Sequence, residues 1–209
     1  VRHQRRLEAD GRRQPLVSVS LFRRRSFAAG NLLILLFYAN NAVLFIAMPL
    51  FLQAGPGMTP FESGLVFAPL ALGFALTSMR VGKLAASRGQ RTLIAGCLLL
   101  GAAYLLFFAL NAAFAPGMSG YEWIPAALLA GVAMGFVSAP LNVLTLAHVR
   151  EDEIGTASGV VTAGVEIAYA LGTVAGGMIF FSIADAGAGY MSAFHGAIGF
   201  NLLLVLGML

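Results

Sequence analysis

One carboxylate, Glu166, lies near the middle of a long apolar stretch that runs from about Ile154 to Ser182. Placing an acidic residue at the centre of a membrane-spanning helix costs about 2.5–3.5 kcal/mol, and such residues usually face a protein interior or a cavity. Burial would favour the protonated form, which would let the group exchange protons near neutral pH. We therefore expect Glu166 to bind a proton, a cationic ligand group, or each in turn. The alternative is a structural carboxylic acid that is hydrogen-bonded to a neighbouring helix.

Helical spacing places small and polar residues on the same face as Glu166. Steps of three or four residues give Gly155, Gly159, Thr162, Glu166, Tyr169, Thr173 and Gly177. This face is expected to line a cavity, with Thr162 and Tyr169 beside the carboxylate. The spacings Gly155/Gly159 and Gly172/Gly176 also permit close approach of another helix.

Neutral polar side chains lie inside two other apolar stretches. Asn40 and Asn41 follow Tyr38 in the middle of the first stretch, and Asn142 comes just after Pro140 in the fourth. All four are candidates for a substrate cavity. The alternative is interhelical hydrogen bonding, worth about 0.6 kcal/mol per bond on average. Both alternatives stay open for Asn41 and Asn142, and the interhelical one is favoured for the others.

Six apolar stretches are long enough to hold these residues in a membrane. Hydrophobic residues make up 59% of the 209 residues and charged residues 11%, whereas soluble domains carry about 25% charged residues. A span needs roughly 20 apolar residues, and in lipid an isolated segment satisfies its backbone only as a helix. The sequence predicts an all-α membrane protein whose six transmembrane helices cover about 27–53, 61–82, 92–113, 123–148, 154–182 and 190–209. Thr59, Pro60 and Glu62 form a predicted capping box before the second helix.

The thirteen basic residues lie in alternate connections. Eight arginines occur in residues 1–26, one basic residue is Arg150, and the remaining four are Arg80, Lys83, Arg88 and Arg91. This positive-inside pattern predicts a multi-pass protein of the plasma (inner) membrane, with residues 1–26 as a basic cytoplasmic linker. Anionic lipid, not nucleic acid, is the expected partner of the linker, since no aromatic stacking platform accompanies it. The first residue is Val1 and the last apolar stretch runs to Leu209, so we expect a piece of a longer polypeptide.

Chemistry that needs clustered reactive side chains is not expected. The only cysteine is Cys97, and His3, His148 and His195 show no metal-ligand spacing. The spans contain no paired nucleophile and base, and no phosphate-binding Gly-rich loop occurs. The sequence therefore predicts neither an enzyme nor a cofactor.

The connection after the second predicted helix resembles the signature loop of the major facilitator superfamily. That loop has a Gly, an acidic residue four positions on, and then a basic residue, Gly and further basic residues. Gly82, Arg88, Gly89 and Arg91 fit, and Ala86 occupies the acidic position. Such a departure is typical of the C-terminal half of these proteins. The basic entry over 15–27 and the glycines over 155–177 are similar to the fourteen-helix drug:proton antiporter branch.

The resemblance implies a fold and a function. The six helices would form one bundle of a major-facilitator fold, built from two inverted three-helix repeats. The missing N-terminal half would be the partner of this bundle. The implied function is proton-coupled export of small amphipathic or cationic compounds by alternating access. The alternatives are a carrier of another metabolite and a receptor or scaffold without transport.

Overall fold

The computed structural model describes residues 25–114, 117–147 and 149–209, and it describes their side chains except at 25 and 83–87. The arginines before position 25 and His148 lie outside the described residues. The long helices are α2 (Arg25–Ala54), α3 (Pro60–Phe114), α4 (Ile124–Leu146), α5 (Ile154–Ile183) and α6 (Gly189–Met208). Single turns at Tyr121–Trp123, Glu151–Glu153 and Ala184–Ala188 precede the last three helices. The described part of the chain contains no strand, and the predicted all-helical class is confirmed.

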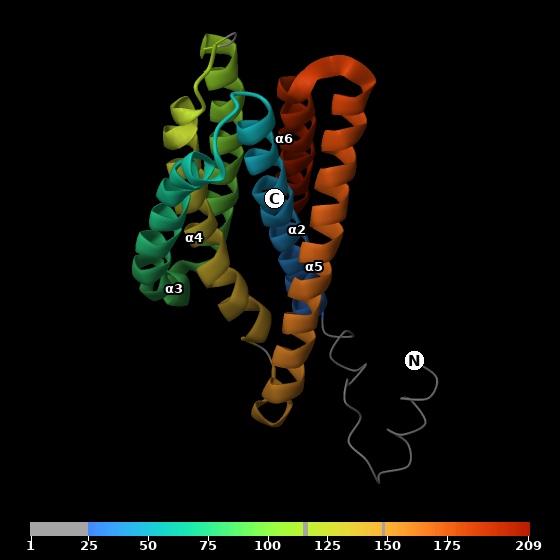
Figure 1. Cartoon of the computed structure of the whole chain (residues 1–209). Coiled ribbons are helices and arrows are strands. Elements are labelled where there is room, and N and C mark those ends of the chain that lie inside the picture. The colour runs from blue at the N-terminus through green and yellow to red at the C-terminus, as the bar shows by residue number, and fades with distance from the viewer. Residues whose placement is uncertain (1–24, 115–116, 148) are drawn as a thin grey trace, which may run out of the picture.

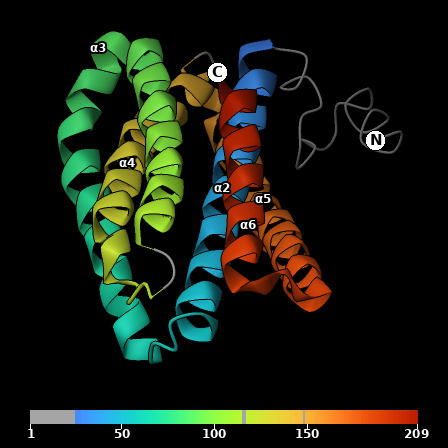
Figure 2. The same cartoon turned by 90° about the horizontal axis from the view of Figure 1, so that it is seen from above.

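α3 is a helical hairpin and not one straight rod. Its backbone leaves the helical region at Arg88 (φ −138°, ψ 34°), and its two limbs, Pro60–Gly82 and Arg88–Phe114, are each long and apolar enough to span a membrane. Figures 1 and 2 show the limbs side by side. We predicted a connection between the second and third spans. The structure keeps most of this connection helical, because Leu84, Ala85 and Ala86 are good helix formers, and confines the turn to the residues around Arg88.

Five candidate spans are present in the described residues, and the last one covers 58 residues, Glu151–Met208. This stretch contains both α5 and α6. The chain reverses between them at Gly187 (φ 80°) and Gly189 (φ 82°), in the left-handed region that favours glycine. With the two limbs of α3, the helices therefore run alternately up and down (Figure 1).

Two carboxylates cap helices at the same end of the bundle. The amide N of Thr59 donates to Oε2 of Glu62 over 2.8 Å, and the Glu62 amide N donates to Oγ1 of Thr59 over 3.3 Å. The predicted capping box is therefore confirmed. An equivalent arrangement before α4 was not predicted: the amide N atoms of Ser119 and Gly120 donate to the Glu122 carboxylate over 3.2 and 2.8 Å.

The helices pack in two groups, α3 with α4 and α2 with α5 and α6 (Figure 2). Glycines allow the closest contacts inside each group. A Cβ at Gly131 of α4 would collide with the backbone carbonyl of Leu70 on α3, and a Cβ at Gly172 of α5 would collide with the carbonyl of Ala39 on α2. Close approach was predicted correctly for Gly172/Gly176, whereas Gly155 and Gly159 have no described residue within 4 Å of an added Cβ.

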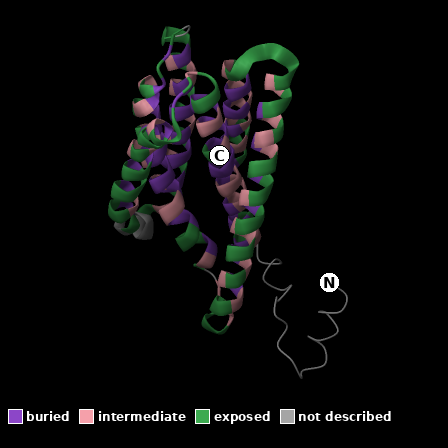
Figure 3. Cartoon of the chain, viewed as in Figure 1, coloured by how far each residue is buried: buried purple, intermediate pink, exposed green. Residues whose placement is uncertain are grey.

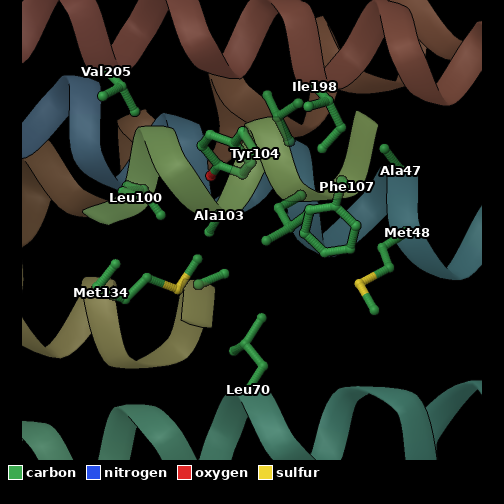
Figure 4. Close-up of a cluster of buried hydrophobic side chains, with 14 of the residues drawn as sticks. Ala47, Met48, Leu70, Leu100, Ala103, Tyr104, Phe107, Met134, Ile198 and Val205 are labelled. Carbon is green, nitrogen blue, oxygen red and sulfur yellow. The ribbon is translucent and has the colours of Figure 1, made fainter. Parts of the chain in front are cut away.

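The buried core runs along the second limb of α3. Figure 4 shows Leu100 and Tyr104 of this limb between Val205 of α6 and Met134 of α4. At the end that carries the capping carboxylates, the indole of Trp123 stacks on Phe194 with ring centroids 4.2 Å apart. These contacts tie the second limb of α3 to α4 and α6.

A hydrogen-bonded chain of three side chains lies beside this aromatic cluster. Nε1 of Trp123 donates to Oδ1 of Asn111 over 2.7 Å, and Nδ2 of Asn111 lies 2.9 Å from Nε2 of His195. Since the indole N–H can only donate, the Asn111 amide is oriented with its NH2 group toward the imidazole. Nε2 of His195 therefore accepts, and the ring is neutral. His195 has a packing role in this position.

The described basic positions gather at one end of the molecule, which we call the basic end. They are Arg25 at the start of α2, Arg150 before α5, and the group Arg80, Lys83, Arg88 and Arg91 around the α3 turn. The connections 55–59, 117–123 and 184–188 lie at the opposite end (Figure 1). The folded chain thus keeps the charge separation that was found in the sequence.

Candidate functional site

A cavity of about 230 Å³ lies where the two helix groups meet. Four helices contribute to it, since its walls come from the middle of α2, the first limb of α3, α4 and α5. The lining side chains are Phe37, Tyr38, Asn41, Phe45, Leu70, Ala71, Phe74, Met134, Ser138 and Tyr169. The lining is mostly aromatic and aliphatic, with a few polar groups, as is usual for sites that bind small molecules.

Asn41 is the lining residue whose side chain has an unpaired polar atom. Its side chain is only 6% exposed, and its Oδ1 has no hydrogen-bond partner among the described residues. Leaving a buried polar group unpaired costs about 1–3 kcal/mol. A ligand in the cavity could donate the missing hydrogen bond to Oδ1 of Asn41 and so offset this cost.

Two tyrosines close the cavity on the side of α5. The rings of Tyr38 on α2 and Tyr169 on α5 have centroids 5.5 Å apart. This contact depends on the close packing of α2 against α5, which Gly172 and Gly176 permit. Tyr38, Asn41 and Tyr169, all predicted as cavity residues, are thus brought together at one site.

Asn40 points away from this cavity. It is fully buried, accepts a hydrogen bond from the Tyr104 hydroxyl at Oδ1, and donates from Nδ2 to the Asn201 carbonyl over 3.0 Å. This is the interhelical alternative, which joins α2 to α3 and α6. The reason is the helical geometry: consecutive residues point about 100° apart, so only one of the two asparagines can face the cavity.

Glu166 and Thr162 lie on the open face of α5. Both are exposed, and Thr162 donates from Oγ1 to the Ser158 carbonyl of its own helix over 3.0 Å. Glu166 forms no hydrogen bond or ion pair with any described residue. It precedes Tyr169 by three residues, so it lies one turn along α5 from the cavity wall. Figure 3 shows that much of α5 is exposed or half-buried.

The other predicted positions lie outside the cavity. Asn142 is exposed on α4 and donates to the Ser138 carbonyl of its own helix over 3.1 Å. Gly82, Arg88, Gly89 and Arg91 lie at the turn of α3, at the basic end. Within the described residues, no group of three His, Cys, Asp or Glu side chains could hold a metal ion.

Most of the apolar lining was missed by sequence reasoning. Phe45, Phe74 and Met134 belong to continuously apolar stretches, in which every position could equally face lipid or the core. Only the packing of four helices distinguishes them. A larger hollow of about 420 Å³ among the connections at the opposite end, lined in part by Phe51 and Tyr190, has no comparable unpaired polar group in the described part of the chain.

Comparison with known proteins identifies the family. Residues 2–173 match the sequence profile of the Major Facilitator Superfamily. The chain belongs to the Major Facilitator Superfamily. It is therefore part of a multi-pass membrane protein from a family of transporters and not of enzymes, and the resemblance noted in the sequence is confirmed.

Several curated relatives have names that refer to transport or resistance. The chain is 30% identical over 184 residues to a probable actinorhodin transporter of Streptomyces coelicolor, which covers 88% of this chain and 32% of that protein. It is 26% identical over 178 residues to a putative multidrug resistance protein MdtD of Serratia proteamaculans, and the matched region covers 84% of this chain and 36% of that protein. It is 27% identical over 176 residues to a methylenomycin A resistance protein of Streptomyces coelicolor, and the matched region covers 82% of this chain and 35% of that protein. The chain spans about a third of the length of the curated relatives it matches.

Proposed function

We propose that this chain forms one six-helix bundle of a secondary transporter that exports small amphipathic or cationic compounds in exchange for protons. The observation that carries the proposal is the four-helix cavity with the unpaired Oδ1 of Asn41. One turn away on α5 is the Glu166 carboxylate, which forms no hydrogen bond or ion pair with any described residue. The transporter and resistance names of the relatives support export as the direction of transport, since export of a toxic compound would give resistance to it.

The proposed architecture has two inverted three-helix repeats. The first repeat is α2 with the two limbs of α3, and the second is α4, α5 and α6. The rest of the transporter covers the open face of α5, where Ile167, Leu171 and Met178 are 55–68% exposed. Exposed apolar side chains in a membrane contact either lipid or another helix, and the Glu166 carboxylate on the same open face favours a protein neighbour. The basic end faces the cytoplasm in a plasma (inner) membrane, where its arginines meet anionic lipid.

In the proposed mechanism the two bundles rock about the cavity and open it alternately to each side of the membrane. Asn41, Tyr38 and Tyr169 orient the compound, while Thr162 and Asn142 extend the polar lining toward the second bundle. Glu166, enclosed when the bundles close, holds either a proton or the cationic group of the compound. Arrival of a proton then favours release of the compound, and no cofactor takes part.

The experiment uses the complete transporter in everted membrane vesicles, with ethidium as the probe. We expect proton-driven ethidium uptake in the natural protein. Glu166→Gln removes the titrating group and keeps its size, so we expect proton-driven uptake to fall by about 10²-fold or more, within the range of a lost proton-transfer group.

The matched control is Glu151→Gln, the same chemical change at an exposed position before α5. It should transport like the natural protein. Uptake by Glu166→Gln at the normal rate and with the normal pH dependence would refute the role of Glu166. Proton-coupled flux of some other compound, without ethidium uptake, would favour a carrier of another metabolite. Failure to transport any compound would favour a receptor or scaffold.

A further inference from the structure

A second, wholly apolar pocket adjoins the cavity on the side of the α2–α3 connection. Its volume is about 320 Å³. The lining side chains are Phe45, Gly64, Phe67, Ala68, Leu70 and Ala71. Three of them, Phe45, Leu70 and Ala71, also line the Asn41 cavity, so the two spaces share a wall. We call this second space the α2–α3 pocket.

Phe45 is the largest side chain that the two linings share. Its ring meets Phe67 of α3 edge to face, with centroids 5.9 Å apart, and its side chain is 42% exposed. The wall between the two spaces is formed by Phe45 of α2 together with Leu70 and Ala71 of α3.

Polar and apolar groups are divided between the two spaces. The Asn41 cavity contains the polar side chains, including Ser138 and the two tyrosines, whereas the lining of the α2–α3 pocket has none. Along α3 the two linings extend from Gly64 to Phe74, which is roughly 15 Å at 1.5 Å per residue. Together they match an elongated molecule with one polar and one apolar end.

Gly64 keeps the α2–α3 pocket open. A Cβ at this position would have no atom within 4 Å, so packing does not require glycine there. By contrast, Gly73 on the same limb is needed for packing, since its Cβ would lie 2.7 Å from the Leu128 carbonyl. The space at Gly64 is therefore available to a ligand.

We propose that the α2–α3 pocket is a second subsite that binds the apolar ring or alkyl end of a compound whose polar end is held at Asn41. This inference rests on the proposed function, since it assumes that the Asn41 cavity holds the transported compound. It adds that the preferred compounds are elongated amphipaths and that affinity rises with the length of the apolar part.

The test measures binding to the purified complete transporter, so it does not depend on transport. The probes are hexyltrimethylammonium and dodecyltrimethylammonium, which share one headgroup and differ in chain length. In the natural protein the dodecyl compound should bind more tightly. Gly64→Leu fills the α2–α3 pocket and should weaken dodecyl binding about tenfold, as expected when about two methylene groups lose their apolar site. Hexyl binding should not change.

The matched control is Gly199→Leu, at a helical glycine of α6 that also has nothing within 4 Å and lines neither space. It should leave both affinities unchanged. Ala68→Leu fills the same pocket from the next turn of α3 and should reproduce the effect of Gly64→Leu, which guards against a folding defect in either variant.

Two results would overturn the subsite. If Gly64→Leu weakened the binding of both compounds equally, the effect would lie in the Asn41 cavity. If it weakened the binding of neither compound, lipid or the rest of the transporter would occupy the α2–α3 pocket. Failure of the proposed function looks different, because the natural protein would then bind both compounds without exporting ethidium.

Discussion

At the scale of single residues, Asn40 and Asn41 show how position on a helix decides the role of one residue type. Asn40 is paired with Tyr104 and the Asn201 carbonyl in the core. Asn41, the next residue, keeps Oδ1 buried and unpaired beside the cavity. The first has the environment of a structural hydrogen-bonding group, and the second that of a ligand-binding group.

This contrast predicts opposite effects for two matched substitutions. Asn40→Leu leaves the Tyr104 hydroxyl buried without its acceptor and should lower the free energy of unfolding by about 1–3 kcal/mol. Asn41→Leu removes an unpaired group and should leave stability unchanged or raised, while weakening ethidium binding. Thermal unfolding and ethidium titration of the detergent-solubilised transporter measure the two effects. If Asn41→Leu were the less stable variant, the assignment of the two residues would be reversed.

Sequence reasoning reached part of the site at this scale. Tyr38, Asn41 and Tyr169 were predicted as cavity residues because polar groups are conspicuous in apolar spans. Phe45 and Phe74 were out of reach, since an apolar residue in an apolar helix gives no signal of which way it faces. The sequence favoured the interhelical alternative for Asn40, which the structure bears out, and left both alternatives open for Asn41. The surroundings of Asn41 depend on how the helices pack, which no local pattern contains.

At the scale of helices, glycines hold α2 against α5 and α3 against α4. The sequence predicted close contacts from glycine spacing, and the structure separates the two pairs on α5. Gly172 and Gly176 lie against Ala39 and Val43 of α2, whereas Gly159 faces open space. Identical spacing is therefore followed by a helix contact at one pair and by none among the described residues at the other, because glycine spacing identifies a small face and does not identify which helix packs on it.

The two kinds of glycine should respond differently to alanine. Gly172→Ala forces a Cβ into the α2 backbone and should destabilise the protein by about 1–3 kcal/mol, the usual cost of overpacking. Gly159→Ala meets nothing in this chain and should be neutral or stabilise by up to about 1 kcal/mol through helix propensity. Thermal unfolding of the two variants tests this. If Gly159→Ala lowered the stability as much as Gly172→Ala, the rest of the transporter would pack closely on this face of α5.

At the scale of the whole molecule, charge and topology agree. The alternation of basic connections was readable from the sequence, and the up-and-down run of the helices places the described basic positions at one end (Figure 1). The long apolar stretches were also readable, because apolar length is a strong signal; the described residues contain five candidate spans, the last of which includes both α5 and α6. What the sequence could not give was the division into two helix groups with the cavity between them, since that depends on contacts between helices distant in the chain.

Membrane orientation gives the last prediction. In a background of the complete transporter from which every cysteine, Cys97 included, has been removed, Tyr121→Cys places a thiol at the end opposite the basic end. Glu151→Cys places one at the basic end, and both positions are exposed. Cys97 is buried, so its replacement by alanine should not change the exposed surface of the protein. If the basic end is cytoplasmic, as the positive-inside pattern predicts, a membrane-impermeant maleimide added to intact cells should label Tyr121→Cys and not Glu151→Cys. Everted vesicles should give the reverse pattern. Labelling of Glu151→Cys in intact cells would invert the orientation and, with it, the side from which the proposed exporter takes up its protons.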